Sequence, residues 1–213
     1  MMNKNMPWKS FFAFPKNKLN LFLVCIILIL MVVFTRYFLL WNEDRHGISI
    51  YDPFINTTVP IDFSIILFLL TNVTVFLGFL RQLKLPYTTI QYLIGVIFIL
   101  LMRLILIFLF PLYAPDNIIP LRDLFLESTI YADKPMTRDL FFSGHTANLC
   151  LLFFIEKNRW LKVLFGVITL VVGILLIWQH VHYTIDVMFA PILTFVCYKI
   201  AKSMTNGYWR KIQ

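Results

Sequence analysis

The chain has 213 residues, of which 60% are apolar and only 14% are charged, and its mean hydropathy is +0.79. Soluble domains contain roughly 45–50% apolar and about 25% charged residues, so this composition excludes a soluble globular protein. The net charge of +8 does not indicate nucleic-acid binding, because the basic residues cluster at the ends of apolar runs and not among aromatic residues on a polar surface.

Six apolar runs have the length that a bilayer-spanning helix needs. They cover residues 21–41, 61–80, 88–113, 140–155, 160–178 and 182–200. The first run is too long for the apolar region of a signal peptide and lacks a cleavage site, so we expect it to be retained. The fourth is short and polar at its start, and the sixth contains Pro191, which we expect to kink it.

The distribution of lysine and arginine predicts how these spans are oriented, because cytoplasmic loops carry an excess of both. Most basic residues lie in the two tails and in the second and fourth loops. The opposite side carries only Arg45, Arg122, Lys134 and Arg138. The sequence therefore predicts an all-α, multi-pass integral membrane protein with six transmembrane helices over residues 21–200. Two basic tails, residues 1–20 and 201–213, would both be cytoplasmic.

With this orientation, ionisable residues from separate spans come together at the non-cytoplasmic side. His145 lies near the outer end of the fourth span, while His182 and Asp186 lie at that of the sixth. Arg103 lies in the third span, about eight residues below its outer end. Charged groups at membrane depth are costly and usually mark functional sites.

The spacing of these residues suits phosphate chemistry. His182 and Asp186 are four residues apart, so on a helix their side chains can meet, and the carboxylate would fix the imidazole tautomer. Ser143 is a plausible N-cap, and Ser143 and Gly144 at a helix start would form an anion site. These residue types favour a site for a phosphoryl group.

The segments DLFFSGHT (residues 139–146) and HVHYTIDVMFA (residues 180–190) resemble the two C-terminal signature motifs of the sphingomyelin synthase family. That family belongs to the wider type 2 phosphatidic acid phosphatase superfamily, six-span enzymes that act on lipid phosphates. The stretch RLILIFLFPLYAP (residues 103–115) is similar to the family's arginine-led segment at the end of the third span, although its proline pattern differs. The resemblance covers about residues 103–199, and the first two spans match in topology only.

The resemblance implies that His182 is the nucleophile, that Asp186 orients it, and that His145 is the general acid and base. The phosphatase branch carries an arginine six residues before its nucleophilic histidine, and this chain has Leu176 there. This difference favours the synthase branch and leaves the phosphate-binding cation to another basic residue. The candidates are Arg103, Arg138 and Lys134, and the predicted phosphate contacts are Arg103, Ser143, Gly144 and Arg138.

We therefore predict a membrane phosphotransferase that moves a phosphocholine- or phosphoethanolamine-type headgroup from a phospholipid donor to a lipid alcohol acceptor. It would use a phospho-histidine intermediate and no cofactor. In the nearest alternative, a lipid phosphate phosphatase, water is the acceptor. A hydrolase with His145, His182 and Asp186 as metal ligands is disfavoured because no His-x-x-x-His or cysteine pair anchors such a site. A transporter or a catalytically silent lipid-binding protein is the alternative from another class, although no paired broken helices are visible.

Overall fold

The structure is a computed structural model that describes residues 4–121 and 136–211. Apart from an isolated bridge between Ile48 and Leu112, the described residues form helices and loops. The helices are α1 (Trp8–Phe11), α2 (Pro15–Glu43), α3 (Pro53–Thr57), α4 (Ser64–Phe68), the π-helix η1 (Leu69–Val73), α5 (Thr74–Gln82), α6 (Pro86–Leu109), α8 (Gly144–Ile155), α9 (Arg159–Trp178) and α10 (Thr184–Lys211).

Five of the described helices are long and apolar enough to cross a membrane. They are α2, the continuous helix Ser64–Gln82 formed by α4, η1 and α5, then α6, α9 and α10. The shorter apolar helix α8 takes the place of the predicted fourth span. The prediction of an all-α, multi-pass membrane protein is confirmed.

The helices of three predicted spans differ from the expected boundaries by several residues. The fourth span was expected from residue 140, but α8 begins at Gly144 because Ser143 is its N-cap. The third span was expected to reach residue 113, but α6 ends at Leu109, shortly before Pro111. The sixth was expected over residues 182–200, but α10 begins at Thr184 and continues to Lys211, so most of the expected C-terminal tail is helical.

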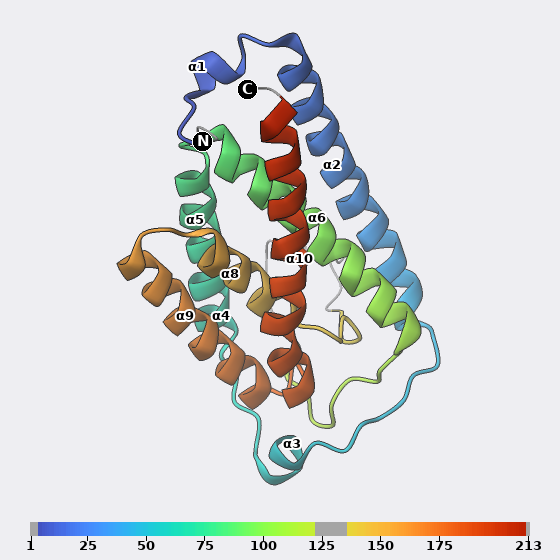
Figure 1. The fold of residues 1–213 in the computed structure, drawn as a ribbon. Coiled ribbons are helices and arrows are strands. Elements are labelled where there is room, and N and C mark those ends of the chain that lie inside the picture. Colours follow the sequence, from blue (N-terminus) through green and yellow to red (C-terminus); the bar gives the residue numbers. More distant parts are fainter. Residues whose placement is uncertain (1–3, 122–135, 212–213) are drawn as a thin grey trace.

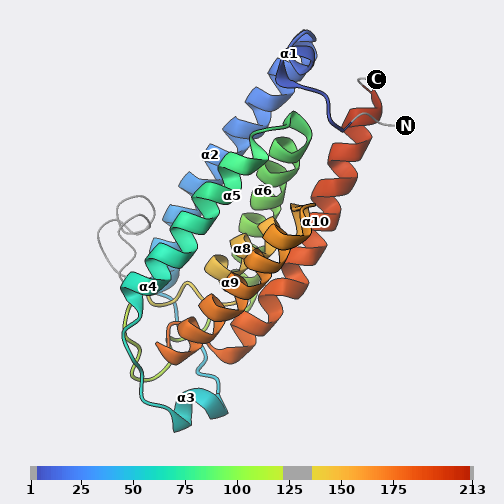
Figure 2. The same ribbon diagram turned by 90° about the vertical axis from the view of Figure 1, so that its left-hand side faces the viewer.

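The helices are arranged around α8, which packs against α5, α6, α9 and α10. Figure 2 shows α6 and α8 between α2 on one side and α10 on the other. Leu151 and Leu152 of α8 are fully buried in the central apolar cluster. The close approach of α6 depends on Gly95, where a Cβ atom would lie 2.8 Å from the side chain of Leu151. The helix at the centre of the bundle is thus shorter than each of the five long spans around it.

The two ends of the bundle differ. Both chain termini lie at one end, and the short helix α3 lies beyond the other (Figure 1). Helix α10 starts at the α3 end and runs up to the C-terminus. The α9–α10 turn, which carries the second histidine motif, is therefore at the end away from the termini.

Candidate functional site

His182 and Asp186 meet at the start of α10. The Nδ1 atom of His182 lies 3.2 Å from Oδ2 of Asp186, and both side chains are buried, with Asp186 entirely inaccessible. The two side chains meet, as their spacing predicts, although His182 lies in the turn that precedes the helix and not on its first turn. The backbone N–H of Tyr183 also donates to Asp186 Oδ2, at 3.3 Å. The carboxylate is therefore held beside the imidazole from two directions.

Asp52, a residue for which the sequence suggests no role, fixes the start of α10. Its carboxylate accepts hydrogen bonds from the backbone N–H of Thr184 at 2.6 Å and from the Thr184 hydroxyl at 3.1 Å. It also caps α3 by accepting from the N–H groups of Phe54 and Ile55. An acidic side chain at a helix N-terminus is stabilising. One carboxylate thus joins the loop before the second span to the turn that holds His182.

The second histidine, His145, lies on the first turn of α8. Ser143 is the N-cap residue, and its hydroxyl oxygen accepts from the N–H of Thr146 at 3.4 Å and from the Thr146 hydroxyl at 3.1 Å. The backbone N–H of Ser143 donates to the backbone carbonyl of Asp186 at 3.4 Å. This bond places the start of α8 directly beside the start of α10, so the two histidine motifs are neighbours.

Arg103 reaches the same place from α6, and only 8% of its surface is exposed. Its Nε atom donates to the backbone carbonyl of Phe142 at 2.9 Å, and its guanidinium forms an ion pair with Asp139. Gly144 lies directly against this guanidinium, because a Cβ atom there would be 2.7 Å from Nη1 of Arg103. The glycine is therefore required for the close approach of the arginine, and not for an unusual backbone conformation.

These groups surround one small cavity of about 20 Å³. It is lined by Arg103, Leu121, Met136, Thr137, Asp139, Gly144, His145, Val181 and His182. Of the predicted site residues, both histidines, Arg103 and Gly144 line the cavity. Ser143 and Asp186 do not line it, but Ser143 precedes Gly144 and Asp186 contacts His182. The sequence thus indicates most of this cluster, but not the pairing of Arg103 with Asp139.

The structure does not bring Arg138 to the cavity. Its guanidinium donates to the backbone carbonyl of Arg45 and lies 4.6 Å from the ring centre of Tyr113. Leu176, where the phosphatase branch has an arginine, is fully buried in an apolar cluster with Leu67 and Leu149. Lys134 lies outside the described residues. Arg103 is therefore the cation, among the described candidates, that lines the cavity.

The turn between α9 and α10 is anchored by two buried polar residues. The Gln179 amide accepts from the N–H of Phe63 at 2.9 Å and donates to the Ser64 hydroxyl at 3.0 Å. The backbone of His180 is in the left-handed region, with a φ of 58°, which is uncommon for a residue other than glycine. Its ring nitrogens lie 3.2 Å from the Asp116 carbonyl and 3.1 Å from the Thr58 hydroxyl. His180 is thus a structural residue that holds the turn leading to His182.

The arrangement can bind and transfer an anionic group. With Nδ1 of His182 facing Asp186, Nε2 is the nitrogen that remains for the cavity, and a carboxylate in this position stabilises an imidazolium. The Arg103 guanidinium and the N-terminus of α8 both favour negative charge. Among the described residues, no cluster of three or more His, Cys, Asp or Glu side chains is arranged to hold a metal ion.

Fold and site together define a multi-pass helical membrane protein with a histidine- and arginine-lined cavity inside the bundle. Residues 138–203 match the family model described as PAP2 superfamily C-terminal. The match includes both histidines and Asp186, and it covers less than half of the chain. It supports the type 2 phosphatidic acid phosphatase superfamily, and with it a lipid enzyme of the phosphatase or phosphotransferase type. No curated protein matches the chain.

Proposed function

We propose that this protein is a membrane phosphotransferase that moves the phosphorylated headgroup of a phospholipid to a lipid alcohol. The observation that carries the proposal is the buried His182–Asp186 pair in contact with a cavity that Arg103 and His145 also line. A nucleophile with an orienting carboxylate, a second histidine and a cation are the groups that this reaction requires.

In the first half-reaction, Nε2 of His182 attacks the phosphorus of the donor lipid. A P–N bond forms, the P–O bond to the glycerol oxygen breaks, and His145 in its protonated form gives a proton to that oxygen. Asp186 stabilises the positive charge on the phosphorylated imidazole, and Arg103 stabilises the negative charge that develops on the phosphoryl oxygens. The products are diacylglycerol and an enzyme whose His182 Nε2 carries the complete phosphorylated headgroup.

In the second half-reaction, His145 removes the proton from the hydroxyl of the acceptor. The acceptor oxygen then attacks phosphorus, the P–N bond breaks, and His182 returns to its neutral state. The cavity of about 20 Å³ has room for roughly one water molecule, so its walls must shift before a phosphoryl group can enter.

A large apolar groove supports a lipid as the substrate. It has a volume of about 430 Å³ and is lined by Leu28, Phe68, Asn72, Val75, Phe76, Phe79, Tyr92, Leu93, Val96 and Asn148. Asn148 links it to the site, because its amide donates to the backbone carbonyl of Gly144 at 3.0 Å. The π-helix η1 contributes Asn72, and π-helical segments occur frequently at functional sites. We assign this groove to an acyl chain of the substrate.

We also propose that the reaction takes place at the non-cytoplasmic face. The excess of lysine and arginine predicts that the chain termini are cytoplasmic, and α10 begins at the end of the bundle away from them. The substrate would accordingly come from the outer leaflet.

The test is turnover of phosphatidylcholine by the purified protein with ceramide, or a diacylglycerol whose acyl chains differ from those of the donor, as acceptor, followed by mass spectrometry of the lipids. We expect a transferred-headgroup lipid, a His182 peptide that carries the phosphorylated headgroup, and a loss of at least 10²-fold in His182→Ala. His46→Ala is the matched control, because His46 does not line the cavity, and it should retain activity.

Other results would select the alternatives. Free phosphorylated headgroup or inorganic phosphate without a transferred lipid would make water the acceptor and the protein a phosphatase. Loss of activity on chelation, restored by a metal ion, would indicate the metal-dependent hydrolase. Unchanged lipid turnover in His182→Ala would contradict the proposed chemistry altogether.

A further inference from the structure

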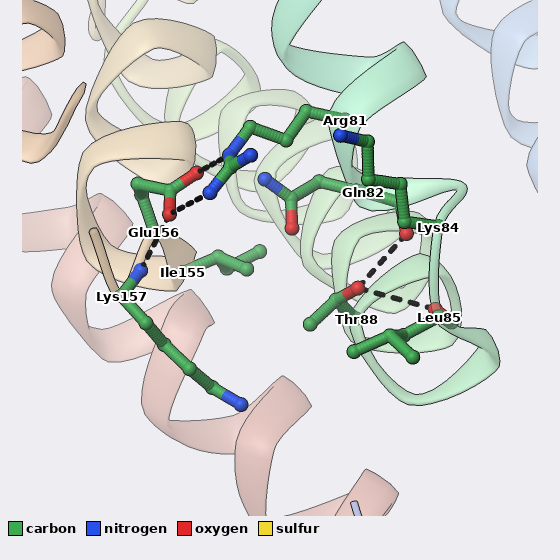
Figure 3. Close-up of a pocket in the computed structure, with 8 residues that line it drawn as sticks. All are labelled: Arg81, Gln82, Lys84, Leu85, Thr88, Ile155, Glu156 and Lys157. Carbon is green, nitrogen blue, oxygen red and sulfur yellow. Dashed lines mark hydrogen bonds and ion pairs between the residues drawn. The ribbon is translucent and has the colours of Figure 1, made fainter. Parts of the chain in front are cut away.

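A second polar cavity lies at the C-terminal ends of α5 and α8, separate from the histidine site. Its volume is about 130 Å³, several times that of the cavity at the histidines, so it has room for a tetrahedral oxyanion. It is lined by Arg81, Gln82, Lys84, Leu85, Thr88, Ile155, Glu156 and Lys157 (Figure 3). None of these residues takes part in the proposed reaction.

The charges around this cavity leave an excess of positive charge. Arg81 is neutralised by Glu156, with hydrogen bonds of 2.5 and 3.1 Å. Glu156 is occupied further by the backbone N–H groups of Lys157 and Asn158, at 2.9 and 2.8 Å. Lys84 and Lys157 form no ion pair with any described residue. Neither lysine is thus paired with a carboxylate from the described part of the chain. The Lys157 side chain points away from Gln82 (Figure 3), with its ammonium 6.0 Å from the ring centre of Tyr87, so it must turn to reach a bound anion.

Gln82 supplies a buried hydrogen-bond donor. The residue is only 3% exposed, and its amide nitrogen has no acceptor among the described residues. Figure 3 shows its side chain pointing into the space between Arg81, Ile155 and Thr88. Its backbone carbonyl accepts from the hydroxyls of Thr88 and Thr89, at 2.8 and 2.9 Å, which fixes its position. A buried amide donor of this kind is costly unless an acceptor is brought to it.

The N-terminus of α6 adds to the positive potential. This 24-residue helix begins at Pro86, and its N-cap residue, Leu85, offers no side-chain acceptor to the first N–H groups. Such a helix start carries partial positive charge and favours an anion. The helix dipole and the buried amide therefore lie beside the same cavity, which Lys84 and Lys157 also border.

The position of the cavity makes a lipid headgroup one source of that anion. The indole N–H of Trp8 in α1 donates to the carbonyl of Leu83, the residue between Gln82 and Lys84, at 2.6 Å. Phe12 and Phe14, just after α1, are exposed. An aromatic segment beside basic residues is typical of a membrane interface.

We propose that this cavity binds the phosphate group of an anionic ligand, either an anionic phospholipid of the leaflet at this end of the bundle or free phosphate. Lys84 and Lys157 supply the charge, and Gln82 donates a hydrogen bond to a phosphate oxygen. The binding site is independent of the reaction proposed at His182.

The experiment compares phosphatidylglycerol with phosphatidylcholine of the same acyl chains, by native mass spectrometry of the purified protein. The variants are Lys84→Ala with Lys157→Ala, and separately Gln82→Leu. Lys16→Ala with Lys18→Ala is the matched control, because it removes the same charge from this end without touching the cavity. Each cavity lysine should contribute about fivefold to phosphatidylglycerol binding. Gln82→Leu should weaken it by a similar factor, and the control should change it less than twofold.

Inorganic phosphate, at constant ionic strength with chloride as the reference anion, distinguishes the two sources. A rise in unfolding temperature with phosphate that the cavity variants abolish, without a preference for phosphatidylglycerol, identifies free phosphate. A preference for phosphatidylglycerol that depends on the cavity residues identifies a lipid. Equal losses in the control pair, or neither a lipid preference nor a phosphate effect in the wild type, would overturn the proposal.

Discussion

Gly144 and Arg103 illustrate how a single side chain can determine the shape of the candidate site. The guanidinium occupies the space where any Cβ atom of residue 144 would lie, and it pairs there with Asp139. Because the arginine ends in a flexible chain, an added methyl group would displace the guanidinium and leave the helices in place.

Gly144→Ala is therefore expected to reduce lipid turnover by about 10²-fold, the loss typical of misplacing a binding group by about 1 Å. The unfolding temperature should change little. Turnover assays and thermal unfolding of the same preparation check both expectations. Gly207→Ala is the control, since nothing lies within 4 Å of a Cβ atom there. Normal turnover in Gly144→Ala would mean that the position of Arg103 is not important for the reaction.

At this scale the sequence predicts the kinds of residue at the site better than their partners. The spacing of His182 and Asp186 is local, so their contact could be anticipated from four-residue periodicity. The bond from Thr184 to Asp52 joins residues 132 positions apart, and no local pattern contains that information. For Arg138, closeness in the sequence is misleading. It lies next to the first histidine motif, but its guanidinium contacts the ring of Tyr113 and the backbone carbonyl of Arg45 and does not reach the cavity.

Among the secondary-structure elements, the start of α10 matters most, since it immediately follows His182. Asp52→Ala would remove the acceptor for the N–H of Thr184 and should lower the free energy of unfolding by about 1 kcal/mol, as the loss of a helix cap does. Turnover should fall as well, because the turn carrying His182 loses its anchor. Chemical denaturation in detergent and turnover assays measure the two effects.

Asp62→Ala is the control for this prediction, because Asp62 also accepts from a nearby backbone N–H, that of Ser64 at 2.9 Å, but at the second span. It should lose less stability than Asp52→Ala and retain turnover. If both variants lose turnover equally, the effect is one of general stability and not of the His182 turn.

The continuous helix formed by α4, η1 and α5 borders the apolar groove that we assign to an acyl chain. Val96→Phe, from the facing wall on α6, would fill part of this groove. It should reduce kcat/KM about tenfold for long-chain substrates and leave short-chain substrates unaffected. Val167→Phe, on the exposed surface of α9, is the size-matched control. If Val96→Phe lowers kcat/KM equally for long-chain and short-chain substrates, the groove does not bind an acyl chain of the substrate.

Helix boundaries were the weakest part of the sequence-based prediction. Apolar residues lie on both sides of Ser143, so a prediction from hydropathy alone begins the fourth span too early. The observed start is set by the N-cap hydrogen bond from the N–H of Thr146 to Ser143. The π-helix η1 leaves no distinct sign in the pattern of apolar residues. All five long spans, in contrast, follow from hydropathy because a helix is the structure that satisfies its own backbone in lipid.

At the scale of the whole molecule, one ion pair joins the second span to the central helix at the end opposite the histidines. Glu156 follows α8 directly and bonds to Arg81 (Figure 3). Burial would raise the pKa of Glu156, but hydrogen bonds from Arg81 and from the backbone of Asn158 outweigh it and hold the pKa below its usual value of 4.5. The folded state therefore favours the carboxylate.

A depressed carboxyl pKa stabilises the folded state above the pKa of the unfolded chain, and this stability is lost as the pH falls through the folded value. Glu156→Gln should lower the unfolding temperature at pH 7, and the difference from the wild type should shrink below about pH 4. Thermal unfolding in detergent between pH 3 and 7 tests this. A difference that is independent of pH would assign the effect to packing.

The length of α8 has a consequence for the surrounding bilayer. Twelve residues of α-helix extend about 18 Å, whereas the hydrocarbon layer is about 30 Å thick. The basic cavity around the Arg81–Glu156 pair places the last turn of α8 at the headgroup layer on that side, so the first turn, next to His182, lies well short of the opposite surface. A phosphorus atom that reaches His182 must therefore sink beneath the plane of the surrounding headgroups, and the bilayer has to thin or admit a funnel of water around the protein at that point.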